Sequence, residues 1–246
     1  MNESEVKKDS PVPLYYQIKE SLKERIESGA LEPHERLPSE RDLENRYGIS
    51  RMTARQALTE LESEGYVYRE QGKGSYVAEP KLRQGLLELT GFSEDMQNRS
   101  MTPGAEVVEQ KLVEPERETA RKLKVAPGEE VFLLKRIRTA ESEPLAIETT
   151  HLRLDLCEGI EKVDFSNCSL YRTLRNEYGL KLSRAEQSVE ATLATEFESN
   201  QLEVPQGAPM LTTERTTFID DGETPVEFAR STYRGDRYKL FVELQG

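Results

Sequence analysis

One stretch of this sequence, Leu37–Leu61, most narrows what the chain can fold into. Ser39 with Asp42 three residues later is a helix-capping pattern, and Gly48 can take the left-handed conformation that ends a helix. Ser50 can cap a second helix, whose apolar stripe consists of Ala54, Ala57, Leu58 and Leu61. Two helices joined by a glycine turn, with arginines outside the stripe, predict a helix-turn-helix that places its second helix in a DNA major groove.

The charge distribution around this motif is uneven. Arg46, Arg51 and Arg55 fall between Asn45 and Thr59 without an intervening acid, although the chain has 34 Lys and Arg against 46 Asp and Glu and a net charge of -12. A local basic island attracts phosphate over about 10 Å at ordinary salt. A solvated helix face that happens to carry arginines would give the same pattern, so the DNA interpretation depends on the neighbouring segments.

Length and composition set the remaining bounds. The 246 residues suffice for one large or two ordinary domains, and 35% hydrophobic content indicates a globular chain. No apolar run reaches the roughly 20 residues of a membrane span, and the N-terminus lacks a signal-peptide core, so we expect a cytoplasmic protein without a membrane partner. Cys157 and Cys168 are expected to be reduced, and neither they nor His34 and His151 have metal-ligand spacing. We therefore expect no metal and no cofactor.

The segments flanking the two helices complete a compact unit. Leu14, Ile18, Leu22 and Ile26 recur every four residues, which predicts an amphipathic helix before the motif. After the motif, two β-prone runs, 66–68 and 75–77, enclose the tip Gly72-Lys73-Gly74 and predict a hairpin. Three helices followed by a basic-tipped hairpin are the arrangement of a winged helix, which we place at residues 1–78.

These segments resemble the DNA-binding domain of the GntR family of bacterial repressors. The matching motifs are Pro13-Leu14-Tyr15 with Gln17-Ile18, Leu37-Pro38-Ser39-Glu40-Arg41, Ser50-Arg51-Met52-Thr53 with Arg55-Gln56-Ala57-Leu58, Glu64-Gly65-Tyr66 and Gln71-Gly72-Lys73-Gly74-Ser75. The resemblance implies operator contacts by Arg41, Arg51, Thr53 and Arg55, with Ser50 at the start of the same helix, and minor-groove contacts by Gly72 and Lys73. Arginine can pair with guanine through two hydrogen bonds, while Thr and Lys mostly hold phosphate.

The remainder of the chain predicts a mixed α+β domain. A charged linker interrupted by Pro80 is placed at 79–88, and the second domain at 89–246. Leu89, Phe92 and Met96 have helical spacing, and an antiparallel sheet is expected because strands pair into hairpins around polar turns, the last turn being Asp220-Asp221-Gly222. We expect helices over 116–124, 169–178 and from Thr195, and strands over 107–113, 131–139, 145–152, 182–193, 210–218 and 226–233.

This second half resembles the effector-binding (UTRA) domain of the HutC-type branch of the GntR family, which has a chorismate-lyase-like fold. The motifs are Leu89-Thr90-Gly91-Phe92-Ser93-Glu94-Asp95-Met96 with Pro103-Gly104, Leu134-Lys135-Arg136-Ile137-Arg138, Ala146-Ile147-Glu148-Thr149-Thr150-His151, Ser169-Leu170-Tyr171 and Ser231-Thr232-Tyr233-Arg234-Gly235-Asp236-Arg237-Tyr238. The resemblance covers nearly the whole domain and implies that it binds a small molecule.

The strand over 131–139 carries the main candidate for an anion site. Arg136 and Arg138 are two residues apart and therefore share one face of that strand, where two guanidinium groups suit a phosphate or carboxylate. An exposed strand face whose arginines pair with acids is the alternative. The nearby Ser169-Leu170-Tyr171 stands at a predicted helix start, where hydroxyls and free N–H groups favour an anion.

In branch members that sense phosphorylated amino sugars, residues matching Arg136, Arg138, Ser169 and Tyr171 hold the phosphate, and those matching Glu148, Glu227 and Tyr233 face the sugar. This chain has Gly91 where some members have a hydroxyl residue. Phe92 and Ser93 belong to the same candidate segment, although on a helix Ser93 is expected to point elsewhere. His151 is expected to be structural, because no nucleophile or paired acid stands at a recognisable spacing.

The sequence therefore predicts a homodimeric repressor that binds a palindromic operator through residues 1–78. The second domain is expected to supply the dimer and to bind a small anionic metabolite, a sugar phosphate first of all. Two alternatives remain open. The effector could be an amino-acid derivative, an organic acid or a phosphonate, or the chain could be a lyase-like enzyme with a DNA-binding head, since fold analogy alone does not decide function.

Overall fold

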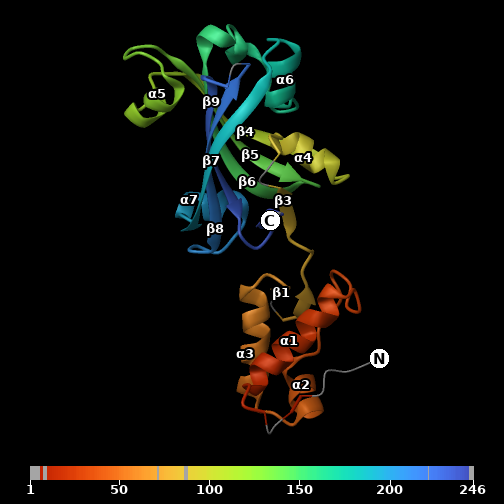
Figure 1. Ribbon diagram of the computed structural model, residues 1–246. Helices are drawn as coiled ribbons and strands as arrows, with labels where there is room; N and C mark the ends of the chain where they lie inside the picture. Colours follow the sequence, from red (N-terminus) through yellow and green to blue (C-terminus); the bar gives the residue numbers. More distant parts are fainter. Residues whose placement is uncertain (1–5, 8–9, 71, 86–87, 221, 244–246) are drawn as a thin grey trace. The chain divides into compact units, whose positions relative to one another are not determined.

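The computed structural model describes residues 6–7, 10–70, 72–85, 88–220 and 222–243. Gln71 of the predicted hairpin tip, positions 86 and 87 of the predicted linker, and Asp221 of the last predicted turn lie outside the described residues. The chain divides into two compact units, Met1–Leu82 and Arg83–Gly246 (Figure 1). No described helix is long and apolar enough to cross a membrane, and no group of three His, Cys, Asp or Glu among the described residues could hold a metal.

The first unit contains three helices and a hairpin. Helices α1 (Leu14–Glu27), α2 (Glu40–Tyr47) and α3 (Arg51–Ser63) precede strands β1 (Val67–Glu70) and β2 (Gly74–Val77). The predicted local signals are confirmed: Ser39 and Asp42 form a capping box on α2, Gly48 ends that helix at φ 60°, and Ser50 caps α3. The predicted stripe of α3 is buried in one core with Ile18 and Leu22 of α1.

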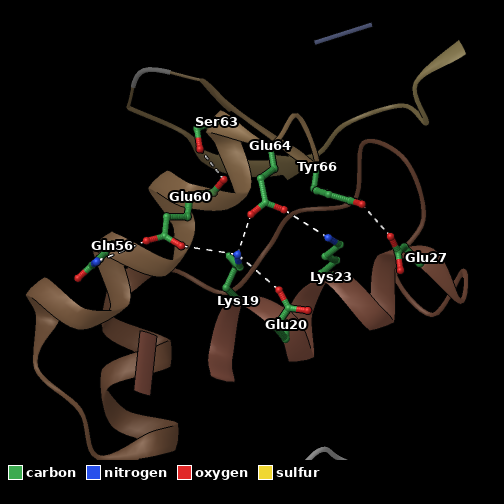
Figure 2. A network of polar contacts seen from close by, with 9 residues as sticks. All are labelled: Lys19, Glu20, Lys23, Glu27, Gln56, Glu60, Ser63, Glu64 and Tyr66. Atoms are coloured by element: carbon green, nitrogen blue, oxygen red, sulfur yellow. Dashed lines mark hydrogen bonds and ion pairs between the residues drawn. The ribbon is translucent and has the colours of Figure 1, made fainter. Parts of the chain in front are cut away.

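A polar network joins α1 to the C-terminal end of α3 (Figure 2). The Lys19 ammonium, whose side chain is 8% exposed, donates to Glu64 Oε1 at 2.7 Å and lies 3.7 Å from Glu60. Lys23 contacts the other Glu64 oxygen at 3.4 Å, and Tyr66 donates to Glu27 at 2.7 Å. The hydrogen bond from Lys19 holds the pKa of Glu64 below its ordinary value, despite the opposing effect of burial. This network fixes the helix that carries the exposed arginines.

The hairpin has a third strand-like neighbour that the sequence did not predict. Residues just before α2 pair with β2: Leu37 N donates to Ser75 O at 2.8 Å, and Val77 N donates to Glu35 O at 2.9 Å. Arg36 stands in this segment, opposite Tyr76. The pairing ties the hairpin to the start of the helix-turn-helix, so both are held in one rigid unit.

The second unit is built on a six-stranded antiparallel sheet of order β4-β5-β6-β9-β8-β7. The strands are β4 (Pro103–Val113), β5 (Val131–Ala140), β6 (Glu143–Arg153), β7 (Leu182–Leu193), β8 (Pro209–Ile219) and β9 (Thr224–Arg234). The helices are α4 (Phe92–Asn98), α5 (Arg117–Leu123), α6 (Leu170–Asn176) and α7 (Glu196–Leu202), with short 3-10 turns at Leu154–Leu156 and Ile160–Lys162. Every predicted strand is present, mostly one to four residues longer than expected, and the capping box at Thr195 opens α7.

Helices cover both faces of this sheet. In Figure 1, α4 and α6 lie on one side of the sheet and α5 on the other. Phe132, Leu134 and Leu152 pack with residues of α6 on the first face, while Ile137 and Ile147 pack with Leu202 of α7 on the second. Two details differ from expectation. Leu89 precedes α4 instead of lying on it, and a separate two-stranded sheet pairs β10 (Tyr238–Phe241) with β3 (Leu82–Gly85).

Candidate functional site

A pocket opens on the face of the sheet beneath α4 and α6. It contains about 630 Å³ of empty space, including its open mouth. All ten residues that the sequence analysis assigned to the effector line it: Gly91, Phe92, Ser93, Arg136, Arg138, Glu148, Ser169, Tyr171, Glu227 and Tyr233. They come from two helix starts and from strands β5, β6 and β9, so the fold gathers in one place residues up to 142 positions apart (233 − 91).

The two arginines of β5 are buried at the floor of this pocket. Arg136 is 2% exposed and Arg138 3%, so the strand face is buried and not exposed, although the pairing with an acid that the alternative expected is present. Both meet Glu148 on the adjacent strand β6: Arg136 Nη2 donates to Glu148 Oε1, and Arg138 Nη1 lies 3.6 Å from the same oxygen. The Nε–H groups of both arginines are buried and have no hydrogen-bond acceptor among the described residues. The floor therefore offers two spare donors to an anion.

Charge and burial have opposite effects on the pKa of Glu148, which lies between Arg136 and Arg138. Burial opposes ionisation of Glu148, but Arg136 and Arg138 attract its carboxylate and hold its pKa below the ordinary value. Burial and the neighbouring Arg136 charge together lower the pKa of Arg138 to about 10. Arg138 and Glu148 are consequently both charged at neutral pH, and two guanidinium groups share one carboxylate.

Ser93 lies in the pocket, which corrects the sequence-based expectation. Arg138 Nη2 donates to Ser93 Oγ at 2.8 Å. Ser93 is the second residue of α4, and side chains in the first turn of a helix point back toward its N-terminus, here over the pocket mouth. A Cβ at Gly91 would stand 3.3 Å from ring atoms of Tyr171. The hydroxyl expected at position 91 is thus supplied two residues later, and glycine leaves room for the tyrosine.

A second polar cluster surrounds Glu227, which also lines the pocket. Tyr171 of α6 and Thr217 of β8 each donate to Glu227 Oε2 at 2.7 Å. Burial raises the pKa of Glu227, and the two hydroxyl donors together with Arg215 offset this only in part. Burial and Glu227 raise the pKa of Tyr171, which therefore stays a neutral donor.

Several lining residues were not predicted, and Arg215 is the most important. Its Nε donates to Gln187 Oε1 at 2.7 Å and its Nη1 to Thr90 O at 3.2 Å. It stands on β8 two residues after the pocket residue Thr213 and therefore on the same face of that strand. Tyr238 of β10 also lines the pocket, and its buried hydroxyl has no partner among the described residues.

Two further predicted residues take structural positions. Ser169 caps α6 by accepting from Arg172 N at 3.4 Å, and the preceding Cys168 carbonyl accepts from Arg136 at 3.5 Å. His151 pairs across the sheet with Phe228, which belongs to the core on the face opposite the pocket. Burial lowers its pKa, and it takes no part in the pocket.

The first unit carries a groove between the helix-turn-helix and the hairpin. Of the residues predicted to contact DNA, Arg41, Arg51 and Gly72 line this groove together with Arg69. Arg55 is exposed one turn along α3, whereas Ser50 and Thr53 hold the helix start, their hydroxyls 2.9 Å apart. Arg51 pairs with Glu40 and Lys73 with Glu70, both at 2.8 Å, and both cations are mostly solvent-exposed. Exposed ion pairs are weak, so these cations can exchange their acids for phosphates.

The sequence analysis did not assign a role to two exposed residues of this unit, Arg36 and Met52. The Arg36 guanidinium lies against the hairpin at Gly74, where a Cβ would stand 3.1 Å from Arg36 Nε; at φ +131° that position also favours glycine. Met52 of α3 is 71% exposed. Sequence periodicity alone could have flagged Met52, since it falls outside the apolar stripe of its helix.

Comparison with known proteins agrees with this architecture. Residues 14–77 match the model of bacterial regulatory proteins of the gntR family, and residues 98–239 match the UTRA domain. The HTH-type transcriptional repressor NagR of Bacillus subtilis is 42% identical over 233 residues, covering 95% of each chain. This chain belongs to the GntR family. It is a transcriptional regulator of the HutC type within that family, which confirms the resemblance inferred from the sequence.

Other GntR-family relatives extend the likeness. The mannosyl-D-glycerate transport/metabolism system repressor MngR of Escherichia coli is 30% identical over 233 residues, covering 95% of this chain and 96% of MngR. The crystal structure of PhnF from Mycobacterium smegmatis superposes with a TM-score of 0.66 at 26% identity, covering 93% of this chain and 99% of PhnF. The predicted two-domain α+β fold of a winged helix and an antiparallel UTRA sheet is thereby confirmed.

Proposed function

We propose that this GntR-family regulator is a homodimeric repressor whose affinity for a palindromic operator is set by a small anionic metabolite, in the first place a phosphorylated amino sugar. The observation that carries the proposal is the buried pair Arg136 and Arg138, which share one carboxylate and keep two Nε–H donors unsatisfied. Leaving buried donors unpaired costs free energy, and a phosphate that accepts from them removes that cost.

The two carboxyl groups that line the pocket suit the sugar. Glu148 and Glu227 present carboxyl oxygens that can accept from the hydroxyl and ammonium groups of an amino sugar. Ser93 adds a hydroxyl that is bonded to Arg138, and Ser169 and Tyr171 add two more to the pocket lining. MngR is named as the repressor of a mannosyl-D-glycerate transport/metabolism system. Mannosyl-D-glycerate is a sugar derivative with a carboxylate, so this name supports an anionic sugar as the class of effector.

The first unit would bind DNA through the groove between α3 and the hairpin. Arg51 or Arg55 would read a base in the major groove, and Lys73 would meet phosphate beside the hairpin tip. Effector binding would change the spacing or orientation of the two DNA-binding units of the dimer, which two half-sites in fixed register would detect.

A direct test measures operator affinity in the presence of candidate effectors. An operator is selected from random duplex DNA with the full chain, and binding is followed by fluorescence anisotropy while glucosamine 6-phosphate, glucose 6-phosphate, glucosamine or inorganic phosphate is added. We expect the phosphorylated amino sugar to change operator affinity by ~10-fold or more, the range of typical allosteric coupling. If no phosphorylated sugar changes the affinity while an organic acid or phosphonate does, the effector assignment is wrong and DNA binding stands.

Arg136→Ala separates effector binding from DNA binding. Charge-assisted hydrogen bonds to phosphate contribute about 1.5–3 kcal/mol each, so we expect this variant to bind the phosphorylated sugar ~10–100-fold more weakly by calorimetry. Its operator affinity without effector should stay within about two-fold of the unaltered chain, because Arg136 belongs to the second unit. A variant that responds to the sugar phosphate like the unaltered protein would show that the arginines serve only the ion pair with Glu148.

A further inference from the structure

The start of α3 presents an apolar side chain to solvent. Met52 is 71% exposed, more than any other large hydrophobic residue that the structure describes. The buried stripe of the same helix, which begins with Ala54, faces α1 and leaves Met52 on the outer surface near Arg55. The folded unit buries little of the Met52 side chain, so its apolar surface is available for contact with a partner.

The two residues beside Met52 are polar and make contacts within their own unit. Arg51 is held by Glu40 at 2.8 Å, and the Thr53 hydroxyl lies 2.9 Å from Ser50 Oγ. If the helix enters the major groove, as the proposed function requires, residues of its first turn meet base edges. Met52 has no strong hydrogen-bonding group, so it can recognise only an apolar feature there. The thymine C5-methyl group is the one apolar feature that distinguishes a base pair in the major groove.

We propose that Met52 reads the C5-methyl group of one thymine in each operator half-site and is thus a specificity-determining residue. The inference rests on the proposed DNA binding and adds a base preference that neither arginines nor backbone contacts would give. Burying one methyl group contributes about 0.8 kcal/mol, which corresponds to about a four-fold change in affinity.

The test is a double-mutant cycle between protein and DNA. In the operator selected with the full chain, each thymine of one half-site is replaced in turn by deoxyuridine, which removes only the methyl group. At one position we expect the replacement to weaken binding of the unaltered chain about four-fold and to leave binding of Met52→Ala unchanged. Met52→Leu, which keeps an apolar side chain, should retain most of the effect.

Leu193→Ala is the matched control, because Leu193 is 68% exposed in the other unit; it should show the same deoxyuridine penalties as the unaltered chain. If Met52→Ala keeps every penalty, or if no thymine gives one in the unaltered chain, Met52 does not read a methyl group. If the selection yields no sequence bound more tightly than random duplex, the proposed DNA binding itself fails. Equal thermal midpoints of all variants exclude misfolding as the cause.

Discussion

At the scale of single residues, the pocket is a set of buried charges that only partly satisfy one another. Burying an ion pair costs several kcal/mol per charge unless hydrogen bonds compensate. Arg136 and Arg138 share the single carboxylate of Glu148, and their Nε–H groups stay unpaired. Such an arrangement contributes little to the stability of the fold. The unpaired Nε–H groups are therefore best explained by a bound anion that accepts hydrogen bonds from them.

Ser93 provides a mild test of this reading. Its hydroxyl accepts from Arg138 and stands where a phosphate oxygen could accept its own proton. We expect Ser93→Ala to weaken binding of the phosphorylated sugar ~5–10-fold, the effect of about one neutral hydrogen bond, when measured by calorimetry. Ser166→Ala, which changes a serine outside the pocket lining, should bind like the unaltered protein. Equal affinities for both variants would mean that the Ser93 hydroxyl serves only to position Arg138.

These residues also show how far sequence reasoning reaches at this scale. The two-residue spacing of Arg136 and Arg138 predicts a shared face, because strand alternation is a local rule. The sequence analysis wrongly expected the Ser93 side chain to point away from the pocket. The direction of a side chain at a helix start depends on how the helix packs, which a local pattern does not give. Arg215 was missed because its alternation on β8 becomes informative only after β8 and β5 are known to line the same pocket.

At the scale of elements, locally encoded features were predictable and long-range pairings were not. The capping boxes at Ser39 and Thr195 were expected from four consecutive residues each, and both are present. The strand-like pairing of residues 35–37 with β2, and the pairing of β3 with β10, join segments about 40 and 155 residues apart. Four-residue strands without clear alternation give no period-2 signal, so no local rule could reveal them.

The contact between α1 and α3 gives an element-scale prediction. Glu64→Gln should reduce the protection of α1 and α3 amides from hydrogen exchange by about 1 kcal/mol at neutral pH, since it removes a partly buried ion pair. Because the folded pKa of Glu64 is lowered, its stabilisation is present above its ordinary value of 4.5 and is lost as pH falls through the folded pKa. The difference between the two proteins should therefore shrink below about pH 4.

Glu32→Gln is the control for this experiment, because Glu32 is exposed and its side chain makes none of the described ion pairs. It should match the unaltered chain within about 0.5 kcal/mol at every pH. A deficit in Glu64→Gln that stays constant through the acid range would show that the carboxylate's charge is not what stabilises the helix pair.

At the scale of the whole molecule, one small winged helix attached to an acidic chain of net charge -12 is a weak DNA binder by itself. Tight binding needs two such units on a two-fold site. In this arrangement the half-sites of the operator mirror the dimer, and their separation along the helix must place both major grooves on the same side of the DNA. The effect of half-site spacing on affinity therefore tests whether the second unit forms the proposed dimer.

Insertion of about five base pairs between the half-sites of the selected operator rotates one of them to the far side of the duplex. We expect the affinity of the full chain to fall toward that for a single half-site, and the slope of log affinity against log salt to become about half as steep, because one set of phosphate contacts is lost. Insertion of about ten base pairs restores the rotational phase and should recover part of the affinity.

Sedimentation of the free protein should give twice the mass of one chain. An operator whose affinity and salt slope are the same with and without the five-base-pair insertion would mean that each chain binds DNA independently, and the regulator would then have to act on a single DNA-binding unit.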